Sequence, residues 1–217
     1  MNLLKESVII LVNQVKDGLI MTKINVILGS VREPSMGHRL FTYLENHQDE
    51  LEAKNGVAIN FIKIGDYKLA PYNEPFPPMA TPDYVNTLDG NQKKWVEDVS
   101  DADGMLLLAP EYDYSIPGAL KTALDYLAQG VNDKPVQVIS YSMGKVGGLL
   151  GTMALLPVFQ VLNMITLSHN MQLANIQNVF TADGELNPDL SDKEKTYYTD
   201  RIDGVVKNLA HYAKLLK

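Results

Sequence analysis

Three short stretches of this sequence hold most of the residue types that could do chemistry. They read GSVREPSMG at residues 29–37, PEYDYSIPGALKTALDYL at residues 110–127, and SYSMGKVGG at residues 140–148. Each follows an apolar run that is typical of a buried strand. Because ligands of an open α/β sheet bind beyond the carboxyl ends of its strands, the loops in these three stretches are predicted to form one site.

The first loop has the features of a phosphate-binding turn. It leads into a helical pattern, and the N–H groups of a helix start, the hydroxyls of Ser30 and Ser35 and the guanidinium of Arg32 all suit an anion. It is not a P-loop, since GxxxxGK(S/T) is absent, and it is not GxGxxG either. The spacing is equally compatible with a second interpretation, in which Ser35 caps the helix and Arg32 is a solvated surface residue.

The second loop is unusual for a connection between a strand and a helix. It carries two tyrosines, two acids and two prolines where a few plain polar residues would suffice. Aromatic and proline side chains offer a rigid apolar wall to a flat ring. In an extended segment, Tyr112 and Tyr114 would face one way while Glu111 and Asp113 face the other. The alternative is that Pro117 only starts the helix and the tyrosines pack as core.

The third loop is rich in glycine. Gly144, Gly147 and Gly148 would let the backbone approach the edge of a ligand closely. Lys145 could add a positive charge near an anion. The alternative is a flexible turn with a solvated lysine.

Short apolar strands alternate with helical patterns along the rest of the chain. Strands are predicted at 24–28, 57–64, 104–109, 136–141 and 166–173, and helices at 36–54, 91–100, 117–128, 148–163 and from the capping box SDKE at 191–194 onward. This alternation predicts an α/β fold in which helices cover both faces of a parallel sheet. A long loop at 65–90 holds five of the eleven prolines.

Composition limits the classes of partner. The chain has 217 residues, a formal net charge of −7 and a pI near 5.1, which argue against nucleic acid and anionic membranes as partners. The absence of cysteine excludes a disulfide scaffold and a thiolate metal site, and it favours a cytoplasmic protein. The four histidines show no metal-ligand spacing. No apolar stretch approaches the roughly 18 residues that span a bilayer.

Residues 1–20 stand apart from this pattern. They carry an apolar stripe at helical spacing, after which Met21 begins a fresh run into the first strand. We therefore expect residues 1–20 to be an N-terminal extension, either an added helix or a segment upstream of the natural start. The domain proper is expected at residues 21–217.

Taken together and in this order, GSVREPS, PEYDYSIPGALKTALDYL and SMGKVGG resemble the motifs of the NADPH-dependent FMN reductase family of flavodoxin-like flavoproteins. The resemblance covers roughly residues 23–175. It implies a flavodoxin-like, doubly wound sheet of five parallel strands with helices on both faces. It also implies noncovalent FMN, with NADPH or NADH as co-substrate, and a small-molecule electron acceptor such as a quinone, a flavin, an azo dye or a metal ion. The oligomer would be a homodimer or a tetramer.

Carried over by motif, the resemblance also implies site residues. The phosphate of FMN would lie at Ser30, Arg32 and Ser35, with Met36 and Gly37 at the adjoining helix start. The isoalloxazine would lie along Pro110, Glu111, Tyr112, Asp113 and Tyr114, and Ser142 with Gly144 and Gly147 would close the other side. The redox chemistry belongs to the flavin, so no catalytic acid, base or nucleophile is assigned.

The sequence departs from the family pattern in a few places. Asp113 and Thr122 stand where the pattern has asparagine, Met36-Gly37 is unusual for the phosphate loop, and Pro157 lies inside a predicted helix. Two other functions remain open on the sequence: a flavodoxin-type electron carrier that does not turn over pyridine nucleotide, and a non-enzymatic regulator. The first is disfavoured because the Thr/Ser-rich phosphate loop usual in flavodoxins is absent.

Overall fold

The structure is a computed structural model that describes residues 21–88 and 90–217. The expected extension at residues 1–20 lies outside the described residues.

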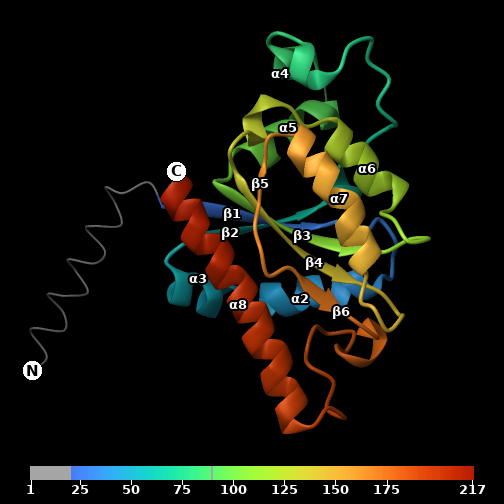
Figure 1. The fold of residues 1–217 in the computed structure, drawn as a ribbon, viewed down its shortest axis with the longest axis vertical. Coiled ribbons are helices and arrows are strands. Elements are labelled where there is room, and N and C mark those ends of the chain that lie inside the picture. Colours follow the sequence, from blue (N-terminus) through green and yellow to red (C-terminus); the bar gives the residue numbers. More distant parts are fainter. Residues whose placement is uncertain (1–20, 89) are drawn as a thin grey trace, which may run out of the picture.

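A parallel sheet forms the centre of the molecule (Figure 1). Its strands run in the order β2-β1-β3-β4-β5, and β6 also pairs with β4. Their bounds are Lys23–Leu28 (β1), Ala58–Lys63 (β2), Gly104–Pro110 (β3), Pro135–Tyr141 (β4), Ile165–Thr166 (β5) and Met171–Leu173 (β6). Every residue of β3 and β4 is buried, as expected where helices cover both faces of a sheet. The predicted flavodoxin-like α/β fold is confirmed.

The predicted fifth strand is interrupted in the middle. The sequence predicts one strand at 166–173, whereas the structure has the short strands β5 and β6, and His169 between them has a left-handed φ of 64°. Side chains fill the gap: Gln137 of β4 donates to the carbonyls of Ser168 and His169, and the main-chain N–H of Val138 donates to Asn170 Oδ1. The fifth position of the sheet is therefore held partly by side chains in place of a backbone ladder.

Helices cover the two faces in two groups (Figure 1). One face carries α2 (Met36–Asn46), α3 (Gln48–Asn55) and α8 (Asp192–Leu216), and the other carries α5 (Gly90–Ser100), α6 (Gly118–Asp125) and α7 (Leu149–Val161). The strands divide their side chains between the two cores, with Val26 facing the first group and Ile27 the second. The single helix predicted at 36–54 is broken at His47, whose φ and ψ of −105° and 13° are not helical.

The C-terminal helix starts as the sequence predicts. Ser191 Oγ accepts from the N–H of Glu194, and the Glu194 carboxylate accepts from the N–H of Ser191, which completes the capping box. Ile202, Val205 and Leu209 are buried against the sheet.

The segment from residue 64 to residue 88 connects β2 to α5 over the carboxyl end of the edge strand. It holds two 3₁₀ turns, η1 (Ile64–Tyr67) and η2 (Pro78–Ala80), and the one-turn helix α4 (Tyr84–Thr87). The Tyr67 hydroxyl donates to Asp98 of α5 at 2.6 Å, and its ring packs edge-on against Trp95. These contacts fix η1 to the body of the protein beside the end of β2.

Pro157 lies inside helix α7, as the sequence predicts, and the helix extends on both sides of it. Leu155 and Phe159 are buried, whereas Met153 and Val161 are 54% and 73% exposed. The helix therefore presents an apolar stripe to the surface. Among the described residues, no helix is both long enough and apolar enough to cross a membrane.

Candidate functional site

The three loops singled out by the sequence meet at the carboxyl edge of the sheet. The N–H of Gly29, after β1, donates to the carbonyl of Leu108 in β3 at 2.9 Å. The N–H of Glu111, after β3, donates to the carbonyl of Tyr141 at the end of β4 at 3.1 Å. Gly37 of the first loop lies against the Tyr141 side chain. The predicted convergence of the loops is confirmed.

The first loop turns tightly into α2. Ser35 is the N-cap of this helix, and its Oγ accepts from the N–H of His38 at 3.1 Å. Ser30 is buried, and its Oγ accepts from the N–H of Arg32 at 3.3 Å, whereas the Arg32 side chain is exposed. The capping interpretation of Ser35 is thus confirmed, but the N–H groups at the start of α2 still point toward the loop. The side chain of Met36 packs against the core under the loop, in contrast to the exposed side chain of Arg32.

Tyr141 is a site residue that the sequence did not single out. Its hydroxyl is buried beside Ser30 but makes no hydrogen bond of normal geometry. A Cβ on Gly37 would lie 1.9 Å from the Tyr141 hydroxyl oxygen, so only glycine fits there. Burial raises the pKa of Tyr141 well above its ordinary value, so the hydroxyl keeps its proton at neutral pH. Tyr141, at the end of β4, therefore places an unpaired, protonated donor beside the first loop. The signal in the sequence that could have pointed to Tyr141 is its position at the carboxyl end of a central strand.

The second loop forms a tight turn instead of an extended wall. The N–H and carbonyl groups of Tyr112 and Ser115 are hydrogen bonded to each other at 2.9 and 2.8 Å, and Asp113 and Tyr114 between them have left-handed φ values of 50° and 61°. The predicted alternation, with both tyrosines on one side, is wrong because it requires extended backbone. Asp113 and Tyr114 are instead both exposed at the tip, Tyr114 to 75%.

Glu111 links the second loop to α7. One of its carboxylate oxygens, Oε2, accepts from the N–H of Leu150 at 2.8 Å and from the N–H of Gly151 at 3.1 Å. These are N–H groups of the first turn of α7, whose own N-cap, Gly148, has no side chain to offer. A carboxylate in this position is also favoured by the helix dipole. Glu111 therefore positions the helix start, while Pro110 before it ends β3 as a buried residue.

The third loop is hydrogen bonded to the end of β6 and to the residues that follow it. The N–H of Ser142 donates to the carbonyl of Leu173, and Gly144 accepts at its carbonyl from the N–H of Asn175. Gly147 and Gly148 have φ values of 62° and 82°, and a Cβ on Gly147 would lie 2.8 Å from main-chain atoms of the segment 172–174. Gly147 is thus required by the fold itself. A Cβ on Gly144 would meet nothing closer than Ser142 Oγ at 3.5 Å, so the fold gives no reason for glycine there.

A cleft of about 530 Å³ opens beside the first loop, between it and the segment that follows β2. Ser30 and Arg32 line one wall, Lys63 and Lys68 line the other, and Ala119 at the start of α6 lies at one end. No group of three His, Asp or Glu residues within 21–88 and 90–217 is arranged to hold a metal ion. At the carboxyl edge of the sheet, the hydrogen-bond donors of Ser30 and Arg32 therefore line a cleft and are suited to an anionic group.

A parallel sheet of the order β2-β1-β3-β4-β5, covered by helices on both faces, defines the flavodoxin-like class of α/β proteins. The family of NADPH-dependent FMN reductases matches residues 22–178. Because this match covers well over half of the sequence, the chain belongs to that family, which is one of flavin-dependent oxidoreductases.

Individual relatives agree with this placement. An NAD(P)H-dependent FMN reductase of Nectria sp is 34% identical over 130 residues, which are 59% of this chain and 62% of the relative. A quinone reductase of Pseudomonas putida is 29% identical over 191 residues, 84% of this chain and 93% of the relative. The solved structure of FerB, a flavoenzyme NAD(P)H:acceptor oxidoreductase of Paracoccus denitrificans, has a TM-score of 0.62 at 22% identity, covering 90% of this chain and 98% of that one, which supports the fold.

Proposed function

We propose that this protein holds FMN noncovalently and uses it to reduce small-molecule acceptors, quinones foremost, with NADPH or NADH as the electron donor. Membership of the family and the names of the relatives support this reaction. The observation that carries it is the meeting of the three loops at Tyr141, where an unpaired buried donor and a helix start face one another across Gly37.

The first loop suits the phosphate of FMN. Ser30, Arg32, the start of α2 at Met36 and Gly37, and the Tyr141 hydroxyl are all hydrogen-bond donors, and an ionised phosphate only accepts. Ser35 would contribute mainly by fixing the start of the helix, since its Oγ already accepts from His38. Gly37 keeps the helix start clear for the anion and for Tyr141 at once.

The second and third loops suit the flat ring. Tyr112 and the main chain around it, together with Ser142 and Gly144, would border the isoalloxazine on two sides. Glu111 would orient this part of the site through α7 and would not touch the ring, because its carboxylate is already bound to two main-chain N–H groups. Tyr114, at the exposed tip, would lie at the mouth of the site.

FMN, when bound, would supply the hydride-accepting ring of the reaction. The residues of this chain would bind and orient the cofactor. The Tyr141 hydroxyl, with its raised pKa, holds its proton throughout and acts as a fixed donor. No residue here is assigned to take a proton from the substrate.

The test is a spectrum of the purified protein followed by anaerobic addition of NADPH or NADH. We expect flavin absorption that bleaches on addition of the donor and returns on addition of a quinone. Flavin that is bound but not bleached by either donor would indicate an electron carrier instead, and failure to bind FMN would contradict the proposal.

Replacement of one cation tests the phosphate assignment. Arg32→Ala should weaken FMN binding by about tenfold, because it removes a charge-assisted hydrogen bond that is partly screened by water. Arg201→Ala is the matched control, since Arg201 is an exposed arginine of α8 that contacts the Tyr197 ring. Equal dissociation constants for the wild type and Arg32→Ala would contradict the assignment.

The exposed stripe of α7 supports a homodimer. Leu149, Leu150, Met153 and Val161 are 44%, 41%, 54% and 73% exposed, and they follow one another along a single helix. A second copy of the chain would cover them, with a tetramer as the larger assembly. Met153→Glu should therefore shift the mass measured by light scattering from dimer to monomer, and a monomeric wild type would contradict this.

The lack of cysteine supports placing the enzyme in the cytoplasm.

A further inference from the structure

Three large apolar side chains are exposed on the second and third loops. Tyr114, at the tip of the second loop, is 75% exposed, and Met143 and Val146 of the third loop are 64% and 55% exposed. A single exposed apolar residue is common on a protein surface, whereas a group of them beside a ligand site marks a binding surface. We call Tyr114, Met143 and Val146 the apolar rim.

The two loops that carry the apolar rim meet at the start of α7. On the side of the second loop, a Cβ on Gly151 would lie 3.2 Å from the carbonyl oxygen of Ser115 and 3.5 Å from Cα of Glu111. The third loop leads directly into the same helix, and the N–H of Leu149 donates to the carbonyl of Val146 at 3.3 Å. The apolar rim therefore borders the start of α7 on the side of the loops, whereas the exposed stripe of this helix runs away from them.

The backbone of the apolar rim is fixed by hydrogen bonds. Two main-chain bonds of 2.9 and 2.8 Å close the turn that has Tyr114 at its tip. In the third loop, the carbonyl of Gly144, next to Met143, accepts from the N–H of Asn175 at 3.2 Å. Only side chains would therefore have to be ordered when a ligand binds, which keeps the entropic cost of binding small.

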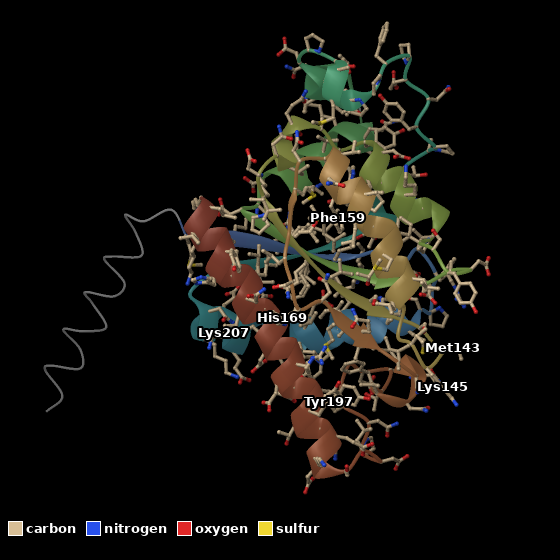
Figure 2. All side chains as sticks on the ribbon, in the orientation of Figure 1. Met143, Lys145, Phe159, His169, Tyr197 and Lys207 are labelled. Atoms are coloured by element: carbon tan, nitrogen blue, oxygen red, sulfur yellow. The ribbon has the colours of Figure 1, made fainter. Side chains whose placement is uncertain are left out.

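The charges beside the apolar rim are opposite in sign. Asp113 precedes Tyr114, Lys145 lies between Met143 and Val146, and both charged side chains are exposed. Met143 and Lys145 project from the same side of the molecule (Figure 2). An ionic ligand gains no net attraction from one acid and one base, whereas an uncharged apolar ligand gains by burying its surface. The rim thus suits an uncharged apolar group.

The apolar rim belongs to the loops that would border the isoalloxazine, so an acceptor that reaches the flavin passes beside it. Its three side chains are far fewer than the roughly 20–30 residues that each partner contributes to a stable protein interface. We propose that Tyr114, Met143 and Val146 bind the hydrocarbon side chain of the acceptor, so that the protein prefers uncharged quinones that carry an alkyl chain. This inference rests on the proposed function.

Steady-state kinetics with a series of quinones tests the inference. 2-Methyl-, 2-propyl- and 2-pentyl-1,4-benzoquinone each carry one alkyl group, so they differ in chain length and hardly in the reactivity of the ring. We expect kcat/KM to rise about twofold for each added CH₂ group, compared with the roughly fourfold that full burial of a CH₂ group would give. A kcat/KM that does not depend on chain length would overturn the inference.

A double variant locates the effect. Met143→Gln with Val146→Thr keeps the size of both side chains but makes them polar, and it should reduce the rise to less than about 1.3-fold for each CH₂ group. The pentyl-to-methyl ratio of kcat/KM is compared, because this ratio does not depend on the amount of active protein. The control is Leu215→Gln, which changes a 65% exposed leucine in the last turn of α8 and should keep the full rise.

Two results with the double variant would overturn the role of the apolar rim. One is a rise with chain length equal to that of the wild type. The other is a shift from dimer to monomer in light scattering, since the rim would then be covered by a second copy of the chain. An unchanged mass together with a reduced rise supports the inference.

Binding can also be observed without turnover. In the FMN-saturated protein with isotope-labelled methionine methyl groups, Met143→Gln assigns the Met143 signal in the NMR spectrum. Pentylhydroquinone, added without an electron donor, should shift this signal more than methylhydroquinone does, and an unshifted signal would overturn the inference. Failure of both NADPH and NADH to reduce bound flavin would contradict the proposed function, and the NMR comparison would still decide whether the rim binds an alkyl chain.

Discussion

Glu111→Ala should destabilise the protein although the side chain is only half-buried. The carboxylate accepts from two main-chain N–H groups of α7, at 2.8 and 3.1 Å, and no other side chain caps this helix. Hydrogen bonds to a charged group contribute about 1.5–3 kcal/mol each when buried, and the dipole of a helix adds about 0.3–1 kcal/mol. Because water reaches one side of this site, we reduce the two bonds to about 1 kcal/mol each. The expected loss in the free energy of unfolding is about 2–3 kcal/mol.

Urea denaturation of the FMN-free protein at neutral pH measures this loss. Glu111→Gln keeps an acceptor oxygen without the charge, so it should lose only about 1 kcal/mol. Glu45→Ala, which removes an exposed glutamate from α2, should stay within about 0.5 kcal/mol of the wild type. FMN affinity should fall in Glu111→Ala more than in Glu111→Gln, since the second loop and α7 lose their connection. A Glu111→Ala protein as stable as Glu45→Ala would refute the reasoning.

The remaining predictions concern charge, kinetics and the chain start. Asp113→Asn should change the FMN midpoint potential by less than about 20 mV, because an exposed carboxylate acts through water; a rise near 60 mV, equivalent to about 3 kcal/mol, would put the carboxylate beside the flavin. A chain without residues 1–20 should fold and hold flavin as the full chain does, and aggregation or loss of half the flavin would show the segment to be structural. Double-reciprocal plots against NADPH should be parallel at different quinone concentrations, since donor and acceptor share one exposed face of the ring; intersecting lines would contradict this. Partial burial raises the pKa of Asp98, but hydrogen bonds from Lys94 and Tyr67 outweigh it and lower the pKa below its usual value. Asp98→Asn should therefore cost about 1 kcal/mol at pH 7, and the difference should shrink as pH falls below the usual range of an aspartate and through the lowered pKa, because the wild-type carboxyl then becomes protonated as well; a cost that does not change with pH in the acid range would argue against the ion pair.

The fold was predictable because its signals are local. Apolar runs such as 104–109 and 136–141 are long enough to mark interior strands, and the capping box at 191–194 marks the start of α8 to the residue. The break at His47 left no such signal, since the segment 36–54 contains no proline or glycine after Gly37. Helical patterns of this kind do not show where two short helices meet.

The details of the site depended on contacts between distant residues. Asp113 and Tyr114 are not the Asn-Gly pair that usually announces a tight turn with left-handed residues, so an extended loop was predicted where a turn formed. Tyr141 was missed because its role follows from Gly37, which lies in another loop. The commitment of Glu111 to α7 likewise depends on how the second loop folds back. Motifs located the loops, whereas side-chain directions needed the structure.

The interruption of the fifth strand has a consequence for the behaviour of the protein at high concentration. An open sheet edge offers a row of unpaired main-chain groups on which a strand of another molecule can add. At this edge β5 and β6 are only two and three residues long, and the gap between them is occupied by side-chain hydrogen bonds of Gln137 and Asn170. A foreign strand would find no continuous template there. This edge of the sheet is thus protected against fibril-like growth by the same residues that complete it.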